Sequence, residues 1–267
     1  MSEPSVVALL CRTSDRSAGG ARAARAVAEA IAARCETTAR IVGSPGDPRD
    51  SLYEEDLRDS RGCLLEAGGQ IDDALDAGRF PVLVSAHCSI CVTTLPVVAG
   101  HVPGVRILWV DAHGDFNTPR TTLSGFFGGM CLAAACGRWD AGFGNTIDPT
   151  QVIVAGARDL DPGEAEELSA AGVLVVDGVG AVADAVDGHS VFVHLDLDVV
   201  DPTELPASFP APGGPSTAAV RTLLEEVVAA ADRIVGVEIT PFDASDDEED
   251  NERMADRCAW IAEPLLP

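Results

Sequence analysis

The chain contains no lysine, since all 18 basic residues are arginine, and these face 43 acidic residues for a formal net charge of −25. The absence of lysine excludes Schiff-base chemistry, pyridoxal phosphate catalysis and P-loop nucleotide binding, because each requires a lysine amine. The negative charge argues against nucleic acid or an anionic membrane as a partner, because phosphate groups would be repelled. It would instead attract metal ions and substrates that carry a guanidinium group.

Long hydrophobic runs are also missing. No segment approaches the roughly 20 apolar residues needed to cross a bilayer, because Asp or Arg interrupts every long run. No basic region precedes the first apolar run, Val6 to Cys11, so a signal peptide is not expected. We therefore expect a cytoplasmic protein without a membrane partner.

The eight cysteines include only one CxxC motif, which Cys88 and Cys91 form. A zinc ribbon would need a second CxxC. In a chain of this length without a secretion signal, reduced thiols are more typical than a disulfide framework. We expect most of the cysteines to be buried packing residues.

Hydrophobic runs of strand length alternate with helical patterns along the 267 residues. Strands are expected at about 5–11, 39–43, 80–86, 105–111, 151–156, 173–176, 190–196 and 233–239. Helices are expected at about 18–34, 51–77, 91–101, 163–171, 216–231 and 249–262. Continuous runs of Val, Ile and Leu are typical of strands buried on both faces. The pattern predicts one domain, residues 1–267, with a doubly wound parallel sheet.

A segment rich in proline and glycine, 202–215, is expected to be a long functional loop rather than a domain linker. The acidic run 246–249 is expected to be the solvated start of a helix.

Carboxylates and a histidine gather where three expected strands end: Asp111, His113 and Asp115 after 105–110, Asp196 and Asp198 after 191–195, and Glu238 after 234–237. The carboxyl ends of parallel strands share one sheet edge, where ligands bind in such folds. Carboxylates crowded there without partners would repel each other and hold protons. Bound cations would resolve that repulsion.

The spacing of these residues strengthens the expectation of a metal site. Alternate residues of an extended segment point the same way. Asp111, His113 and Asp115 can therefore share one side, as can Asp196 and Asp198. Carboxylates with an imidazole suit Mn²⁺ or a similar ion, and bridging carboxylates hold two such ions together. A lone DxD often caps a turn, but DxHxD and DxD at two strand ends predict a dinuclear centre.

Five segments resemble, in order, the ureohydrolase family, which includes arginase: DAHGDFNTP (111–119), SGFFGGM (124–130), GARDLDPGE (156–164), HLDLDVVDP (194–202) and GVEITP (236–241). A sixth, VLVSAHCS (82–89), stands where a further metal-binding motif of the family belongs. The resemblance implies the three-layer α/β/α sandwich of arginases and deacetylases, with a mainly parallel sheet.

The resemblance also implies how two manganese ions would be held. Asp111 and Asp196 would bridge the ions, Asp115 would complete one shell, and His113 and Asp198 would complete the other. A hydroxide between the ions would attack the guanidino carbon, because paired metals lower the pKa of water.

Contacts with the substrate are implied as well. Asp115 would pass a proton to the departing amine, and Glu238 would pair with the guanidinium. Asn117 and Ser124 would hold the α-carboxylate of a guanidino amino acid, with Asp161 near its α-amino group.

Two positions depart from the family pattern. Cys88 stands where relatives carry a histidine ligand in GGDHS, and thiolate suits Mn²⁺ less well than imidazole does, so one site is expected to be weaker or altered. Gly128 stands where relatives carry, in SGNxHG, a histidine that assists proton transfer. Its absence argues against ordinary arginase activity and is expected to leave room for an N-hydroxyl group.

These departures, with TLPVV (94–98) and ACGRWD (135–140), resemble one branch of the family. Its members hydrolyse Nω-hydroxy-L-arginine to L-ornithine and hydroxyurea in the biosynthesis of the antibiotic D-cycloserine. N-hydroxylation makes the guanidine less basic, which eases attack and reduces the need for a separate proton shuttle.

Alternatives stay open at this point. His87 competes with Cys88 as the metal ligand, and His194 is read either as a core residue or as a supporting residue behind the metal. The chain could also be an arginase or agmatinase, or a catalytically inactive metal-binding relative. The contacts expected for an α-amino acid disfavour agmatine, which has no α-carboxylate.

Overall fold

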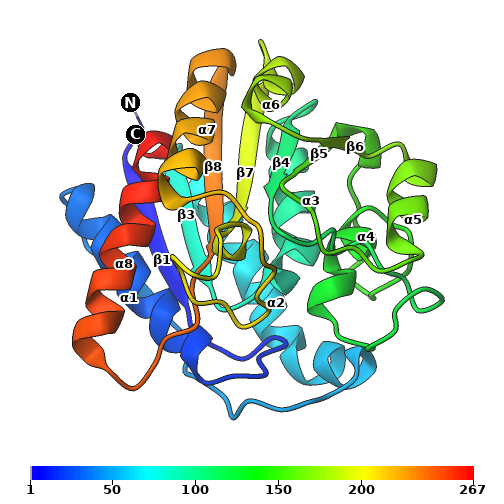
Figure 1. Ribbon diagram of the computed structural model, residues 1–267, viewed down its shortest axis with the longest axis horizontal. Helices are drawn as coiled ribbons and strands as arrows, with labels where there is room; N and C mark the ends of the chain where they lie inside the picture. Colours follow the sequence, from blue (N-terminus) through cyan, green and yellow to red (C-terminus); the bar gives the residue numbers. More distant parts are fainter. Residues whose placement is uncertain (1) are drawn as a thin grey trace.

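Eight apolar runs form one parallel sheet in the computed structural model, which describes residues 2–267 (Figure 1). The strands are β1 (Pro4–Leu9), β2 (Arg40–Val42), β3 (Phe80–Ser85), β4 (Arg106–Val110), β5 (Val152–Ala155), β6 (Leu174–Val176), β7 (Ser190–Asp196) and β8 (Arg233–Thr240). They lie in the order β2-β1-β3-β8-β7-β4-β5-β6, and every pairing is parallel. All eight expected strands are confirmed.

The helices that connect the strands are α1 (Gly19–Arg34), α2 (Tyr53–Asp76), α3 (Cys91–His101), α4 (Cys131–Ala135), α5 (Glu164–Ala171), α6 (Val179–Val186), α7 (Thr217–Ala230) and α8 (Glu248–Ala262). Six of these were expected to within two residues at each end. The two that were not, α4 and α6, have only five and eight residues. The five residues of α4 are too few to display a helical period, and the sequence of α6 is almost wholly apolar, so it lacks the polar positions that mark the equally long α5.

The helices cover both faces of the sheet, so the molecule has three layers (Figure 1). One core packs the apolar sides of α1, α6, α7 and α8 against one face, and the second packs α2, α3, α4 and α5 against the other. Adjacent residues of β7 serve different cores, Phe192 the second and Val193 the first. The expected three-layer α/β/α sandwich is confirmed.

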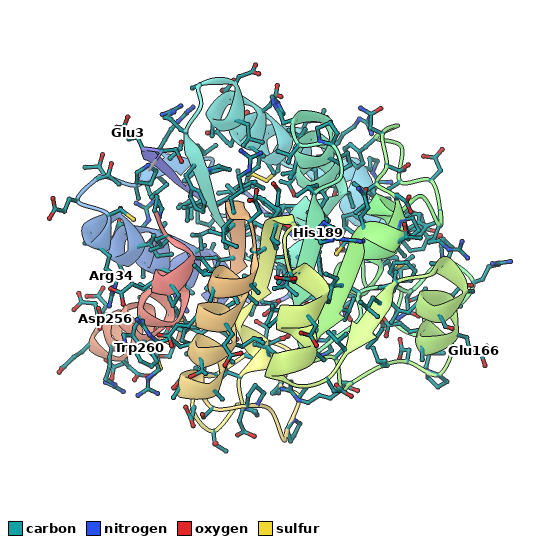
Figure 2. All side chains as sticks on the ribbon, turned by 90° about the horizontal axis from the view of Figure 1, so that it is seen from above. Glu3, Arg34, Glu166, His189, Asp256 and Trp260 are labelled. Carbon is teal, nitrogen blue, oxygen red and sulfur yellow. A yellow bond between two sulfur atoms is a disulfide. The ribbon has the colours of Figure 1, made fainter. Side chains whose placement is uncertain are left out.

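Neighbouring helices are also tied by polar contacts at the surface. Arg34 of α1 donates to the Asp256 carboxylate of α8 at 2.7 Å, and the two residues lie side by side when the molecule is seen from above (Figure 2). Within residues 2–267, no helix has the length and apolar character that crossing a membrane requires.

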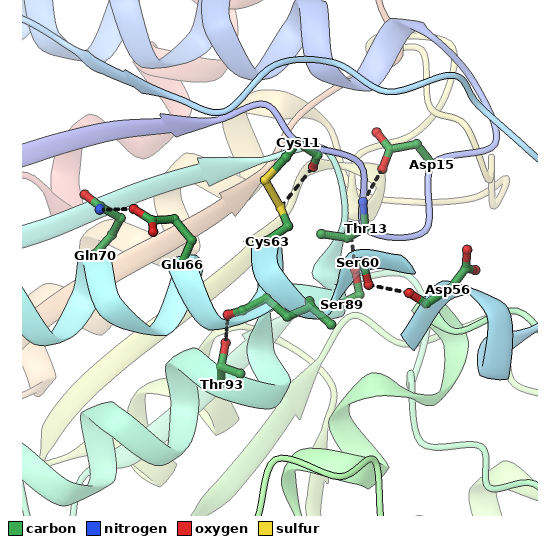
Figure 3. Close-up of a disulfide and its surroundings, with 11 residues drawn as sticks. Cys11, Thr13, Asp15, Asp56, Ser60, Cys63, Glu66, Gln70, Ser89 and Thr93 are labelled. Atoms are coloured by element: carbon green, nitrogen blue, oxygen red, sulfur yellow. Dashed lines mark hydrogen bonds between the residues drawn. A yellow bond between two sulfur atoms is a disulfide. The ribbon is translucent and has the colours of Figure 1, made fainter. Parts of the chain in front are cut away.

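The cysteines depart from the expectation that they would be reduced. Cys11, just after β1, forms a disulfide with Cys63 of α2, and the two Cα atoms are 6.0 Å apart (Figure 3). The prediction is therefore wrong for this pair. Their separation of 52 residues forms no local motif, and only the packing of α2 beside β1 brings them together.

The expected loop at 202–215 and the expected helix start at 246–249 are both present, while a function for the loop stays a prediction. Residues 202–215 run without helix or strand between a short 3-10 helix, η4 (Leu197–Val199), and α7. The acidic run precedes and opens α8, where the Asp247 side chain caps the helix by accepting from the backbone N–H groups of Glu249 and Asp250.

Candidate metal centre and active site

A cavity of about 280 Å³ opens at the carboxyl edge of the sheet. The carboxyl ends of the strands point to the lower side of the molecule in Figure 1. Nine of the ten residues predicted for the site line it: Cys88, Asp111, His113, Asp115, Asn117, Ser124, Asp161, Asp196 and Asp198. Glu238 does not. The strand-end rule predicted five of the nine, which are up to 87 positions apart in the chain: Asp111, His113, Asp115, Asp196 and Asp198. The other four were implied by the family resemblance.

Local backbone geometry holds the carboxylates in place. The Asp111 carboxylate follows β4 directly and accepts from the His113 backbone N–H at 2.7 Å and from the Trp109 indole N–H at 3.1 Å. Asp115 has a left-handed backbone (φ 48°), which is uncommon outside glycine. The Asp196 carboxylate accepts from the Asp198 backbone N–H at 2.8 Å and so starts η4.

One group of metal-capable residues joins Asp111, His113 and Asp198. The His113 Nδ1 atom lies 3.0 Å from an Asp198 oxygen and 3.3 Å from an Asp111 oxygen. Burial alone would lower the pKa of His113, but the two carboxylates outweigh it and raise that pKa to about 12. A bound cation would replace the proton that His113 holds between the carboxylates.

A second group joins Cys88, Asp111 and His194, whose ligand atoms lie within 4.8 Å of one another. The Cys88 thiol donates to an Asp196 oxygen at 2.9 Å. Burial, reinforced by the nearby aspartates, raises the pKa of Cys88 well above its usual value. Cys88 therefore needs a cation to become a thiolate ligand.

The remaining carboxylates carry more negative charge than their surroundings compensate. Burial and the Asp111 charge raise the pKa of Asp115 well above its usual range. Burial and the charges of Asp198 and Asp111 do the same for Asp196, and the pKa of Asp198 itself is raised to about 6. Oxygen-rich donors with imidazole and thiol fit a pair of divalent cations such as Mn²⁺.

The predicted substrate contacts line the same cavity. Asn117 donates from Nδ2 to the Asp161 carboxylate at 2.9 Å, so these two side chains are adjacent. Ser124 is exposed, and its hydroxyl accepts from the Phe126 backbone N–H at 3.2 Å. Glu164 also lines the cavity, and burial raises its pKa to about 7.

The room expected beside Gly128 is filled. A Cβ atom on Gly128 would lie 2.4 Å from Cε1 of Phe126, so the Phe126 ring occupies the space of a side chain at position 128. Phe126 packs in turn against Phe209 from the 202–215 loop, with ring centroids 4.8 Å apart. This side of the cavity is an apolar wall, and the expectation that Gly128 opens free space is wrong.

Glu238 lies one level below the sheet edge, because β8 continues beyond it to Thr240. Its carboxylate accepts from the Thr94 hydroxyl at 2.6 Å and lies 2.7 Å from His194 Nδ1. The contact between Glu238 and a guanidinium stays a prediction, since the carboxylate would have to give up these partners.

His87 packs edge-on to Phe126 and near Phe209, with ring centroids 6.0 and 6.3 Å apart. Burial lowers its pKa. Within residues 2–267, His87 belongs to none of the metal-capable groups, whereas Cys88 belongs to one. The geometry favours Cys88 over His87 as the residue nearer the metal.

Several lining residues were not predicted, and two of them carried a usable signal. Arg16 follows β1 at the same sheet edge, and its guanidinium lies over the Phe126 ring at 4.5 Å. The segment after the first strand leads to the same sheet edge as the other strand ends, and this position is the signal that indicates Arg16. Phe209 lies in the segment already expected to be a functional loop.

Comparisons with known sequences agree with this geometry. The sequence model of the arginase family matches residues 54–264. The chain is 37% identical over 264 residues to N(omega)-hydroxy-L-arginine amidinohydrolase of Streptomyces lavendulae, covering 96% of this chain and 93% of that protein. It is 34% identical over 195 residues to arginase of Brevibacillus brevis, covering 64% of this chain and 65% of that one.

Solved structures share the fold along its whole length. Arginase from Bacillus cereus superimposes with a TM-score of 0.80 at 26% identity, over 99% of this chain and 98% of that one. Arginase from Bacillus caldovelox gives a TM-score of 0.81 at 24% identity, with the same coverage. Proclavaminate amidino hydrolase from Streptomyces clavuligerus gives 0.74 at 20% identity, over 99% and 90% of the two chains.

Proposed function

The chain belongs to the arginase family, and we propose from this that it is a manganese-dependent amidinohydrolase that cleaves Nω-hydroxy-L-arginine to L-ornithine and hydroxyurea. The observation that carries the proposal is that the buried carboxylates of two strand ends and the polar side chains of Asn117, Ser124 and Asp161 line one cavity. The 37% identity to an enzyme named for this substrate supports the choice of substrate.

Two Mn²⁺ ions fit the donor set of the cavity floor. Asp111 and Asp196 would be shared, Cys88 and Asp115 would complete one site, and His113 and Asp198 would complete the other. When bound, paired divalent ions lower the pKa of water and so supply a nucleophile near neutral pH.

Asp115 is proposed to move the proton that the reaction releases. Its carboxyl is buried beside Asp111, and its backbone carbonyl accepts from the Leu132 and Ala133 N–H groups, which fixes the residue at the start of α4. In the overall reaction the bond between the guanidino carbon and the ornithine nitrogen breaks. The water oxygen stays on the carbon of hydroxyurea, and Asp115 passes a proton to the departing amine.

The polar residues that line the cavity beside the proposed metal ligands support an α-amino acid as the substrate. Asn117, Ser124 and Asp161 are proposed to hold its α-carboxylate and α-amino groups. Arg16 is the one arginine that lines this cavity within residues 2–267, and its buried Nε atom has no hydrogen-bond partner there, although another nitrogen of the guanidinium lies 3.1 Å from the exposed Asp50 carboxylate. A cation in an otherwise acidic cavity favours a substrate carboxylate, which agmatine lacks.

The apolar wall supports a hydroxylated guanidine. Gly128, Phe126 and Phe209 carry no acid or base where arginases of the family carry a histidine. A guanidine of lower basicity depends less on such a group, so the wall handicaps L-arginine more than its N-hydroxy derivative. The resemblance extends the proposal to a cytoplasmic, single-domain enzyme of antibiotic biosynthesis.

Product analysis tests this function. The Mn²⁺-loaded protein is incubated with Nω-hydroxy-L-arginine and, separately, with L-arginine, and the products are identified by mass spectrometry. The proposal requires L-ornithine and hydroxyurea in equal amounts, with none from an Asp196→Ala control. Urea from L-arginine with no turnover of the hydroxylated substrate would identify an arginase. No turnover of either substrate would identify an inactive relative.

A further inference from the structure

His194 lies directly beneath the cavity floor. The register of the sheet aligns it with Trp109 of β4 on one side and with Glu238 of β8 on the other. Alternate residues of a strand share a face, so His194 points to the same side as Asp196, two residues later at the sheet edge. The His194 side chain is fully buried.

Two neighbours fix the orientation of the His194 ring, and a third residue, Thr94, holds one of them. The ring stacks on the Trp109 indole with centroids 3.5 Å apart and an interplanar angle of 5°. Its Nδ1 atom lies 2.7 Å from Glu238 Oε1, and Glu238 Oε2 accepts from the Thr94 hydroxyl at 2.6 Å. A carboxylate is an acceptor, so Nδ1 carries the hydrogen, and a neutral ring then has its lone pair on Nε2.

That Nε2 atom is buried and has no hydrogen-bond partner within residues 2–267. A ring nitrogen of His194 nevertheless lies within 4.8 Å of both the Cys88 sulfur and an Asp111 oxygen. Because Nδ1 is taken by Glu238, Nε2 is the nitrogen that remains for them. Ligands about 2.0–2.3 Å from one ion are separated by roughly 3–4.6 Å. Buried polar atoms are rarely left unpaired, and a cation at this point would satisfy Nε2.

From this arrangement we infer that His194 Nε2 binds the divalent cation next to Cys88 and Asp111, with Glu238 as its positioning residue, an inference that rests on the proposed metal-dependent function. Histidine ligands of metals almost always donate their second ring N–H to a carboxylate or carbonyl, which sets the tautomer and strengthens the ligand. Glu238 occupies that position, and Thr94 holds Glu238. Cys88, after β3, stands where relatives carry a histidine ligand. His194 of β7 would supply the imidazole that this site otherwise lacks.

Counting bound histidine nitrogens in the unaltered protein tests the inference without any mutation. The protein is labelled with ¹⁵N-histidine and loaded with Mn²⁺, and pulsed electron paramagnetic resonance measures the nitrogens coupled to the metal. Two histidines, His113 and His194, are expected. A His194→Gln variant should show one, and so should a His113→Asn variant.

Metal affinity provides the second readout, by calorimetric titration with Mn²⁺. Loss of the ligand in His194→Gln should weaken the Cys88-side site by on the order of 100-fold, and Glu238→Gln should weaken it by about 10- to 100-fold. A Glu238 that only contacted a guanidinium would change KM and leave Mn²⁺ affinity unaltered. His87→Asn is the matched control, because His87 faces Phe126 and Phe209, and it should change the affinity by less than about threefold.

The outcomes separate this inference from the function on which it rests. If His194→Gln fails to fold, the nitrogen count of the unaltered protein and the affinity of Glu238→Gln still decide. A single coupled histidine in the unaltered protein, or an unaltered Mn²⁺ affinity in Glu238→Gln, would overturn the inference and leave the metal-dependent function intact. A protein that binds no Mn²⁺ would overturn both.

Discussion

The floor and the wall of the cavity are built differently and teach different things about the enzyme. The floor is made of the Cys88 thiol after β3 and the carboxylates and histidine that follow β4 and β7, held by backbone N–H groups and by each other. The wall consists of Gly128, Phe126 and Phe209, which come from connecting segments. Under the proposed function the floor carries the charge that hydrolysis needs, whereas we propose that the wall determines which guanidine can react.

Removing a shared ligand from the floor should have the largest effect. Asp196→Ala deletes a proposed bridge between the two ions, so occupancy of both should approach zero and activity should fall by at least about 10⁴-fold. Metal analysis and turnover measure this. Asp201→Asn is the control, because Asp201 lies in the same motif but its carboxylate caps a turn at Thr203, and this variant should keep both ions. Full retention of both ions in Asp196→Ala would contradict a dinuclear centre.

Rebuilding the wall should change substrate choice while leaving the metal alone. Gly128→His alone would collide with the Phe126 ring, so the informative variant is Phe126→Asn/Gly128→His, which restores the residues common in the family. A returned proton shuttle should raise kcat/KM for L-arginine relative to Nω-hydroxy-L-arginine by about 100-fold or more. Phe126→Asn alone controls for the loss of the ring. If the ratio of the two kcat/KM values were unchanged in the double variant, the wall would not determine substrate specificity.

Exchanging the thiol on the floor should have a smaller effect. Cys88→His supplies the imidazole that is typical of the family, so Mn²⁺ affinity should rise by about tenfold, equivalent to ~1.4 kcal/mol. Activity should be retained. Titration with Mn²⁺ measures the change, and weaker binding would show that Cys88 does not contact the metal.

A change of pH should have the smallest of these effects. It should shift the melting temperature of the metal-free protein by several degrees. The folded-state pKa values are raised by burial for Asp115, Asp196 and Glu164, and by the carboxylate partners for His113. The folded protein therefore binds more protons than the unfolded chain, and its stability should fall as pH rises.

Thermal melts after chelation should give a higher Tm at pH 6 than at pH 8, and Mn²⁺ should raise the Tm most at pH 8. Each kcal/mol corresponds to about 2–4 °C in a protein of comparable size. A metal-free protein that melts higher at pH 8 would show that the carboxylates are not crowded as described.

The contrast between floor and wall also separates what the sequence predicts from what it does not. Strands of a parallel sheet are continuous apolar runs, so β3 and β7 could be located directly from the sequence. Locating these strands also located the residues at their carboxyl ends. The Phe126–Phe209 contact joins segments 83 positions apart, and no local pattern announces it. The same holds for the disulfide between Cys11 and Cys63.

The position of Glu238 within its strand changes the role that the sequence suggested for it. The apolar run 234–237, within the strand expected at 233–239, suggested that Glu238 lies at the sheet edge. Because β8 extends to Thr240, the edge position belongs to Thr240, whose hydroxyl lies 3.3 Å from the Cys88 sulfur. Glu238 faces His194 instead, a pairing that depends on the strand register and is invisible in either segment alone.

Side-by-side kinetics at saturating Mn²⁺ test the central claim, that the floor hydrolyses a guanidine which the wall selects. The kcat/KM values for Nω-hydroxy-L-arginine and L-arginine are compared on the unaltered protein, with hydroxyurea and urea identified as products. Because the wall lacks a positioned acid or base, the hydroxylated substrate should be favoured by about 100- to 10,000-fold. If L-arginine proved to be the equal or the better substrate, the account would be contradicted.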